Sequence, residues 1–499
     1  MIELDEGRLA DARVSGSGMG GESAPSLVAQ SGKRLFAVAR ESWLVSEDVE
    51  GPWVCCDSCC RDTIADEDPR AMAEPIGSRR DAASALFNLS GYRVIAVGEE
   101  PIIGRWVDIE VSGRPFCPAC GAAGSKVHSS RSQRVRDIPV AGEVTVIWRK
   151  RRWFCVTATC PKRTFSESTE QVPPYARSTM RLREALVTAV TGAGRAAREV
   201  AASFSVSWWL VQATLTAAAA LIDDVDTLVV RGVGIDEHRF RRVRYFRLPT
   251  GKWRRHEPWM STVVDLDTGR VLGVVDGRDN KGVGAWLAAR PQAWRDRIEV
   301  VAIDPSAAFA KAIAANLPHA AISVDAFHLV KLANDMVTTV RQRLSRQQKN
   351  RRGRLVDPSW ANRRLLLRGA DTLSPRGWAR LRATFTSDDP TEELAAAWGI
   401  KEQLRRLLAC SSLTDAHQEK MRLGHYVQVA DMPETDRLWA TICQWWPAIE
   451  VLIVTGVTNA KTEAANTGIK NIKRIGRGFR NAKNYRALIL LTSAAHSAA

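Results

Sequence analysis

The chain has 499 residues, too many for one ordinary domain, and its apolar content can supply a core for each of about three folded units. Lysine and arginine outnumber aspartate and glutamate by 71 to 55, and the formal charge of +16 favours a polyanionic partner such as nucleic acid. No apolar run is long enough for a transmembrane helix, and Met1–Ser26 lacks the pattern of a signal peptide. We therefore expect a cytoplasmic protein with no membrane partner.

Residues 1–82 differ in composition from the rest of the chain. Glycine and serine dominate Ser15–Ser26, and Asp62–Arg80 is rich in charge, alanine and proline. Such segments bury little apolar surface, so we expect an extension that is largely disordered. It contains Cys55, Cys56, Cys59 and Cys60. These cysteines could bind a metal, but they lack a distant partner pair, and we assign no metal to them.

Two close pairs of cysteines lie within residues 83–175, namely Cys117-Pro-Ala-Cys120 and Cys155-Val-Thr-Ala-Thr-Cys160. Structural zinc takes four tetrahedral ligands, and two short turns joined by strands present thiolates at this spacing. We therefore predict one structural Zn²⁺ ion held by these four cysteines, with His128 as a substitute ligand. Four unrelated buried cysteines are the alternative. Basic residues surround the second pair and make a contact with DNA plausible: Arg149, Lys150, Arg151, Arg152, Lys162 and Arg163.

Residues 176–226 are rich in alanine and have helical periodicity. Small residues from Ala197 place two helices close together, Ser203–Val206 can form the turn, and Ser207 can cap the second helix. This pattern predicts a helix-turn-helix, although a plain helical hairpin explains it nearly as well. In a helix-turn-helix the second helix reads bases with its first residues. The expected DNA-binding residues here are Arg198, Ser207, Trp208 and Gln212.

Residues 227–330 alternate between apolar runs and helical segments. The expected strands are Val229–Ile235, Arg242–Arg247, Trp259–Asp265, Val271–Val275, Ile298–Ile303 and Ala320–Val324, and the expected helices are Val283–Arg290 and Ala307–Asn316. The first strands form a three-stranded antiparallel meander, and Ile298–Ile303 follows it as the fourth strand of the sheet. This order is that of an RNase H-like α/β sheet, in which the first and fourth strands are neighbours.

Acidic residues directly follow three of these apolar runs: Asp236, Asp304 and Asp325. A carboxylate beside a buried strand is costly unless it is paired or coordinates a metal. We expect Asp236 and Asp304 to face each other across one metal-binding edge, and Glu463 to supply a third carboxylate from a later helix. Each acid alone would be read as a solvated or paired side chain, but together they predict a site for two Mg²⁺ (or Mn²⁺) ions.

The remainder of the chain is expected to be mainly helical. Residues 331–450 have apolar residues at helical spacing and are expected to form an all-helical insertion. The basic run Arg341–Arg352 within it suggests contact with DNA, although such a run of charges is usually only a solvent-exposed face. Residues 451–499 are expected to hold a short strand-like run and a basic helix that begins near Glu463. The cations of that helix suit backbone phosphates. They are Lys470, Lys473, Arg474, Arg477 and Arg480.

With these residues in place, the chain resembles the ISL3 family of bacterial insertion-sequence transposases over roughly residues 83–495. The motifs Cys117-Pro-Ala-Cys-Gly121 and Trp153-Phe-Cys155 resemble the zinc finger of that family. Arg231–Glu237 and Val301–Pro305 resemble its two aspartate strands. Further likeness lies in Asp325-Ala-Phe-His328, Thr462–Asn466 and Gly478–Asn481. Residues 1–80 have no counterpart in the family.

The resemblance implies a DDE transposase that cleaves and joins the ends of its element by metal-assisted phosphoryl transfer. It implies a multidomain α+β protein with a zinc ribbon, a helix-turn-helix and an RNase H-like catalytic domain that carries an all-helical insertion. The catalytic metal ligands would be Asp236, Asp304 and Glu463, with Asp325 and His328 as accessory residues; from spacing alone, Asp325 could replace Asp304.

The partners implied are double-stranded DNA, as the terminal inverted repeats of the element and as target DNA, and a second copy of the chain, in a homodimer or larger assembly on DNA. The location implied is the bacterial cytoplasm, at the nucleoid.

Two other functions compete with an active transposase. One is a transposase-derived repressor without catalysis, which the three intact carboxylates disfavour. The other is a cellular nuclease of RNase H type, which the DNA-site-selecting front end disfavours.

Overall fold

A computed structural model describes residues 81–497 except residue 141. The predicted extension lies outside the described residues apart from its last two positions, and so do Cys55, Cys56, Cys59 and Cys60. The described chain begins with α2 (Ala82–Phe87), which Asp81 caps by accepting a hydrogen bond from the Ser84 amide.

The first sheet has the strand order β1-β2-β4-β3, with β5 paired to β4. Its strands are β1 (Tyr92–Glu100), β2 (Gly104–Val111), β3 (Gly124–Val135), β4 (Thr145–Cys155) and β5 (Thr164–Ser166). The sequence predicts β1, β2 and the start of β4 from the runs Tyr92–Val97, Trp106–Val111 and Val144–Trp148, which alternate or are apolar. It did not predict β3, because nearly all residues of β3 are exposed and the strand shows no alternation of apolar and polar side chains.

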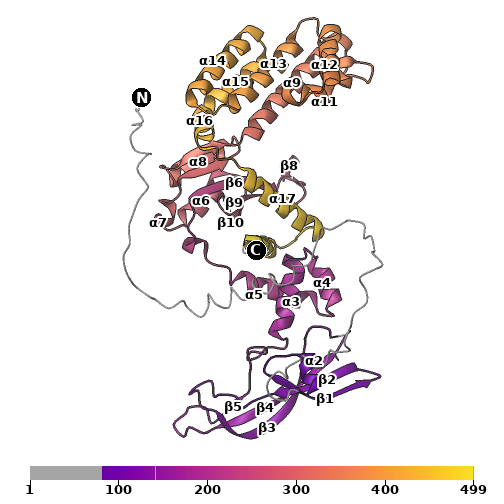
Figure 1. Cartoon of the computed structure of the whole chain (residues 1–499), viewed down its shortest axis with the longest axis vertical. Coiled ribbons are helices and arrows are strands. Elements are labelled where there is room, and N and C mark those ends of the chain that lie inside the picture. The colour runs from indigo at the N-terminus through magenta and orange to yellow at the C-terminus, as the bar shows by residue number, and fades with distance from the viewer. Residues whose placement is uncertain (1–80, 141, 498–499) are drawn as a thin grey trace, which may run out of the picture. The chain divides into compact units, whose positions relative to one another are not determined.

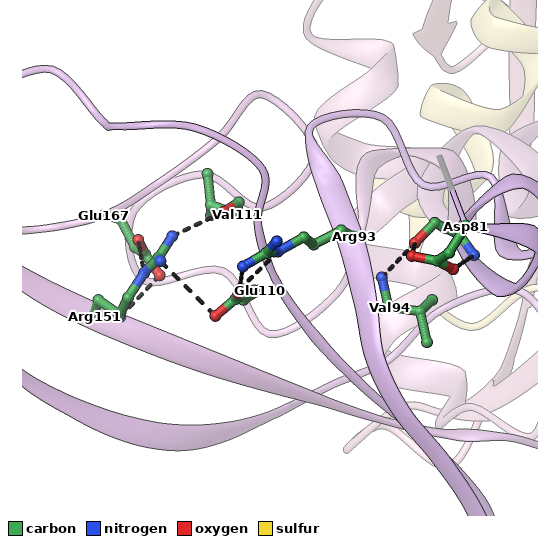
Figure 2. A network of polar contacts seen from close by, with 8 residues as sticks. Asp81, Arg93, Val94, Glu110, Val111, Arg151 and Glu167 are labelled. Carbon is green, nitrogen blue, oxygen red and sulfur yellow. Dashed lines mark hydrogen bonds and ion pairs between the residues drawn. The ribbon is translucent and has the colours of Figure 1, made fainter. Parts of the chain in front are cut away.

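Ion pairs between neighbouring strands hold one face of this sheet together (Figure 2). The guanidinium group of Arg151 lies between Glu167, at 3.2 Å, and Glu110, at 3.8 Å, and also donates to the carbonyl of Val111. Arg93 pairs with the other side of Glu110. Arg151 was one of the cations expected on a DNA-facing rim, but these contacts give it a structural role in the sheet.

Three short helices follow, α3 (Met180–Thr191), α4 (Ala197–Ser203) and α5 (Trp208–Ala219). They pack on one another through buried residues that include Leu186, Val200 and Leu215. The turn between α4 and α5 contains Ser205 in the left-handed region, at φ 48°. Ser207 caps α5, as predicted, by accepting a hydrogen bond from the Leu210 amide at 3.2 Å.

The second sheet has the order β10-β9-β6-β11-β12. Its strands are β6 (Gly232–Arg239), β9 (Trp259–Asp265), β10 (Val271–Asp276), β11 (Val300–Ile303) and β12 (Ala321–Val324), preceded by a short 3-10 turn at Val225–Thr227. The strands β10, β9 and β6 are antiparallel, whereas β11 runs parallel to both β6 and β12. The prediction that the first and fourth strands are neighbours is confirmed. Helices α6 (Asn280–Ala288), α7 (Gln292–Arg295) and α8 (Ala307–Asn316) connect the strands.

Two predictions about this part of the chain are wrong. The run Arg242–Arg247 is not a strand of the meander; it forms β7 (Arg244–Arg247), which pairs only with β8 (Trp253–His256) in a separate hairpin. The strand after Val229 begins at Gly232 and continues three residues beyond Asp236, so this aspartate lies within β6 rather than at its end.

The helices of the predicted insertion leave from β12 and return to it; Figure 1 shows most of them gathered in one all-helical group. They are α9 (Ala326–Lys349), α10 (Pro358–Ala361), α11 (Arg363–Leu366), α12 (Pro375–Asp388), α13 (Glu393–Leu408), α14 (Leu413–Ala430), α15 (Pro433–Gln444) and α16 (Trp446–Thr455), with a 3-10 turn at Ala370–Thr372. One continuous cluster of buried apolar side chains joins them to the sheet, from Val233 to Ile449. The strand-like run predicted after residue 450 is instead the end of α16.

The last two helices are α17 (Ala460–Ile475) and α18 (Ala482–Ser497). Helix α17 contacts β6 and β9, and α18 contacts β10 and α5. In the described part of the chain, no single helix has the length and apolar character to cross a membrane. The bent pair α15 and α16, which meet at 65°, passes the same test by length and composition.

Candidate active site and zinc centre

Three aspartates lie side by side at one edge of the second sheet. In the parallel register, Ile303 of β11 is paired with Ile235 of β6 on one side and with Val324 of β12 on the other. The residue that follows each of these three in the chain is an aspartate, namely Asp236 within β6, Asp304 directly after β11 and Asp325 directly after β12. The register therefore gathers at one level three carboxylates that are far apart in the sequence.

His328, in the first turn of α9, connects two of these carboxylates. Its Nδ1 lies 2.9 Å from Asp325 Oδ2, and its Nε2 lies 3.0 Å from Asp304 Oδ2. The ligand atoms of Asp304, Asp325 and His328 all lie within 4.8 Å of one another, which is close enough to share a metal ion. Asp325 also caps α9. The same residue thus begins the helix and orients the imidazole that the helix carries.

The electrostatics of Asp304 favour a cation at this edge. Burial, followed by the negative charge of Asp236, raises the pKa of Asp304 to about 7. The hydrogen bond to Asp325 raises the pKa of His328. Within the described part of the chain, the Oδ1 atom of Asp304 is buried and has no hydrogen-bond partner. A buried carboxylate oxygen with no partner, beside other carboxylates, suits a hard divalent cation such as Mg²⁺.

Glu463 approaches the same edge from α17. Its Oε1 lies 3.9 Å from His328 Nδ1, and its side chain is 41% exposed. Close packing of α17 on β6 sets this position. A Cβ atom added at Gly234 would lie 1.9 Å from Thr462 Oγ1, so the absence of a side chain at Gly234 lets the start of α17 lie against the strand.

Asn466 fixes the carboxylate of Asp236 and was not among the residues predicted. It donates from Nδ2 to Asp236 Oδ2 at 2.6 Å, and its Oδ1 accepts a hydrogen bond from Thr262 Oγ1 at 2.8 Å. Thr262 Oγ1 in turn lies 2.9 Å from His238 Nδ1. Asn466, Thr262 and His238 are almost completely buried. Because the Thr262 hydroxyl donates to Asn466, His238 Nδ1 is the donor to Thr262, and the chain of hydrogen bonds points toward Asp236.

The cations predicted to bind DNA along α17 differ in their surroundings. Lys470 and Arg474 are exposed and lie two and three turns beyond Glu463 on the same side of the helix. Lys473 is half-buried and donates to the carbonyl of Arg239 at 2.6 Å. Arg480 is exposed, and its carbonyl accepts a hydrogen bond from Arg241.

The residues predicted on α4 and α5 lie near one another. Ser207 is exposed, and its hydroxyl is used in capping. Arg198, Trp208 and Gln212 line a cavity of about 820 Å³ that Arg480 also lines. Trp209, which was not singled out, is the more exposed tryptophan of α5, at 76% against 39% for Trp208.

The four predicted zinc ligands form one cluster at the end of β4. The sulfur atoms of Cys117, Cys120, Cys155 and Cys160 all lie within 4.8 Å of one another. Cys117 and Cys160 are 3.8 Å apart and Cys120 and Cys155 are 3.4 Å apart, too far for disulfides. Thiolates about 2.3 Å from a tetrahedral zinc ion lie about 3.8 Å from one another, so the cluster fits zinc.

The surroundings of the cluster support its role as a metal centre. Hydrogen bonds from the Ala122 amide and the Thr157 hydroxyl lower the pKa of the Cys120 thiol to about 6, which favours the thiolate. Trp153 and Phe165 pack against Cys117 and Cys160. His128, the substitute ligand considered from sequence, lies outside the cluster, with Nδ1 3.1 Å from Ser129 Oγ.

Comparison with known proteins identifies the class of protein. Residues 113–160, which hold the four cysteines, match the model of the zinc finger of transposases IS204/IS1001/IS1096/IS1165. Residues 233–489, just over half of the chain, match the ISL3 transposase model, so the second sheet, the helical insertion and α17 are those of a transposase. The chain belongs to the ISL3 family of transposases.

Individual relatives agree with this assignment. The transposase of insertion sequence element IS1001 from Bordetella parapertussis is 27% identical over 335 residues, which cover 66% of this chain and 77% of that protein. The transposase of IS1557 from Mycobacterium tuberculosis is 26% identical over 319 residues, covering 58% and 71%. Among solved structures, the Drosophila P element transposase strand transfer complex gives a TM-score of 0.35 at 9% identity, over 62% of this chain and 91% of that chain. A similarity of that size supports no inference about fold or function.

Proposed function

We propose that the chain is a DDE transposase that binds the ends of its own insertion sequence and catalyses metal-dependent cleavage and transfer of DNA strands. The observation that carries this proposal is the convergence of Asp236 and Asp304, on paired parallel strands, with Glu463 from α17. The strand order β10-β9-β6-β11-β12, antiparallel and then parallel, supports an RNase H-like class for the catalytic sheet.

Asp236, Asp304 and Glu463 would hold two Mg²⁺ (or Mn²⁺) ions, because oxygen ligands suit hard cations. When bound, such ions activate a water or a 3′-hydroxyl and stabilise the leaving oxygen at phosphorus. Asn466 orients the Asp236 carboxylate, and His328 orients that of Asp304 through its 3.0 Å contact. The contacts of Asp325 with His328 and with the start of α9 support an accessory role for Asp325, as expected from the family.

DNA would be held by the N-terminal parts of the chain and by α17. Helices α4 and α5, joined by a short turn and capped at Ser207, support a helix-turn-helix that binds the terminal inverted repeats. The exposed Lys470 and Arg474 extend from Glu463 along α17 and suit the phosphates of element-end and target DNA. Because two element ends must be cut and joined together, we propose a homodimer or larger assembly on DNA.

The test is cleavage of a DNA fragment that carries the end of the chain's own element, with Mg²⁺ or Mn²⁺, by the full chain and two variants. Asp304→Asn keeps the size of the side chain but removes its charge, and we expect cleavage to fall below detection while binding persists. Asp335→Asn removes an equal charge from an exposed position on α9 and should cleave as the unaltered chain does.

Each other result has a distinct meaning. Specific binding without cleavage by the unaltered chain would favour the repressor. Metal-dependent cleavage that Asp304→Asn retains would contradict the assignment of Asp304. Comparison of Asp304→Asn with Asp325→Asn then decides between the two aspartates, since loss of a metal ligand abolishes cleavage and loss of an accessory residue only slows it.

A further inference from the structure

The β7–β8 hairpin has no apolar core of its own. All residues of β7 (Arg244–Arg247) and β8 (Trp253–His256) are exposed. The tight turn is well formed: Gly251 adopts φ 76°, and the Leu248 amide donates to the Lys252 carbonyl at 2.8 Å. Within the hairpin, Tyr245 is 60% exposed, Trp253 67% and Phe246 43%. An ordered hairpin that presents three aromatic rings to solvent is not explained by folding alone.

Each aromatic residue of the hairpin stands opposite an arginine. The register pairs Tyr245 with Arg255, Phe246 with Arg254, and Trp253 with Arg247. Side chains alternate along a strand, so Tyr245, Arg247, Trp253 and Arg255 share one face. Arg244, Phe246, Arg254 and His256 share the other, where the rings of Phe246 and His256 are 5.9 Å apart. Both faces therefore combine flat rings with guanidinium groups.

The base of the hairpin is tied to the residues beside the candidate active site. Glu257, at the end of β8, pairs with Arg255 and accepts a hydrogen bond from Trp259 Nε1 at 2.7 Å. The guanidinium groups of Arg239 and Arg278 lie 4.9 and 4.7 Å from the Trp259 ring.

Arg278 continues this series of contacts to the site itself. It lies 3.7 Å from Glu237, the neighbour of Asp236 on β6. The base of the hairpin is thus connected through Trp259 and Arg278 to Glu237, next to the candidate metal ligand Asp236 on β6.

We propose that the β7–β8 hairpin binds unpaired nucleotides of DNA beside the active site, with bases stacked on Tyr245 and Trp253 and phosphates held by Arg247 and Arg255. This inference rests on the proposed function. Aromatic rings interleaved with cations suit a single strand, because stacking needs an unpaired base and the cations neutralise the backbone. In an intact duplex each base is already stacked between its neighbours. The hairpin would then act after a strand is nicked or an end is frayed.

The test measures binding of the full chain to a single strand carrying one 2-aminopurine, and to a fully paired duplex of the same length. Stacking quenches 2-aminopurine fluorescence. We expect Tyr245→Ala and Trp253→Ala each to weaken single-strand binding about tenfold and to reduce the quenching, with duplex binding unchanged. Trp253→Tyr keeps a ring and should restore most of the affinity. Tyr175→Ala removes an aromatic side chain that is 100% exposed elsewhere and serves as the matched control.

Single-strand binding and quenching that both alanine variants retain would overturn the proposal. So would an equal loss on single strand and duplex, because that result assigns the hairpin to phosphate contacts alone. Failure of the hairpin proposal is distinct from failure of the proposed function. If only the hairpin proposal fails, the unaltered chain still cleaves element ends. If the proposed function fails and the hairpin proposal holds, the unaltered chain does not cleave element ends, but Tyr245→Ala and Trp253→Ala still weaken single-strand binding.

Discussion

At the residue scale, the position of the Asp236 carboxylate depends on the buried side-chain amide of Asn466. Asn466 uses its donor on Asp236 Oδ2 and its acceptor on Thr262, so its orientation is determined from both ends. Buried hydrogen-bond networks of this kind hold a side chain in one arrangement when each member is satisfied. The Asp236 carboxylate is thereby held in one position, as its proposed role as a metal ligand requires.

Asn466→Ala should therefore weaken the site without removing any metal ligand. We expect the cleavage rate at a fixed, subsaturating Mg²⁺ concentration to fall about 10- to 100-fold, the usual effect of losing a residue that orients a ligand. The Mg²⁺ concentration needed for half-maximal cleavage should rise, and excess Mg²⁺ should recover part of the rate. A purely structural defect would not respond to metal. Asn471→Ala, at an exposed position of the same helix, is the control. An unchanged Mg²⁺ requirement in Asn466→Ala would contradict the positioning role.

The sequence predicted the carboxylates but not the residues that orient them. Asp236, Asp304 and Asp325 each follow an apolar run, and a charge there is informative because burial of an unpaired charge is costly. Asn466 lies one helical turn after Glu463, which is the only local signal of its role. Its partners Thr262 and Asp236 lie on two different strands, and no periodicity links them to α17.

At the scale of elements, the packing of α17 on β6 determines where Glu463 lies. Gly234 lies at this contact, where an added Cβ atom would also lie 2.9 Å from Asn459 Oδ1 and from Leu266 Cδ2. Asn459, directly before α17, is buried. Because atoms crowd this position from two elements, the helix would have to move away from the strand to admit even a methyl group.

Gly234→Ala should accordingly lower both stability and cleavage. Overpacking of this kind costs about 1–3 kcal/mol, and we expect the free energy of unfolding to fall by that amount in denaturant titrations. Adding Thr462→Ala removes the atom at 1.9 Å and should restore part of the loss. Gly399→Ala, in α13 with nothing within 4 Å of the added Cβ, should be neutral or stabilising. Wild-type stability in Gly234→Ala would contradict the close contact.

Elements with a clear hydrophobic period were predicted best. The parallel strands β11 and β12 are buried apolar runs and were found within two residues of their bounds. The hairpin strand β7 was placed in the sheet because aromatic and valine residues favour strands wherever they occur. The end of α16, Val451–Thr455, is apolar and β-branched enough to resemble a strand, but its packing in the helical cluster makes it helical.

At the scale of the whole molecule, the candidate active site joins segments that are far apart in the sequence. The helical insertion separates Asp304 from Glu463 along the chain, yet α9 leaves from β12 and α16 packs back on it. The hydroxyl of Ser323 on β12 donates to the carbonyl of Val457 at 2.6 Å and fixes the returning segment just before α17. The shared apolar core makes the insertion part of the structure that holds the site.

Contacts between segments that are far apart in the sequence explain which features could not be predicted from the sequence. The pairing of β6 with β11 and the cluster of four cysteines were both predicted from local patterns. The exposed strand β3 and the contact between α17 and β6 depend on pairing between segments that are far apart in the sequence, which composition and periodicity do not contain.

The central claim is that Asp236, Asp304 and Glu463 form one site for divalent metal. The most direct measurement is the anomalous scattering of Mn²⁺ in crystals of the full chain, compared with crystals of Asp304→Asn. We predict Mn²⁺ within ligand distance of all three carboxylates, and loss of that density in the variant. Mn²⁺ bound only by Asp325 and His328, away from Asp236 and Glu463, would contradict the account.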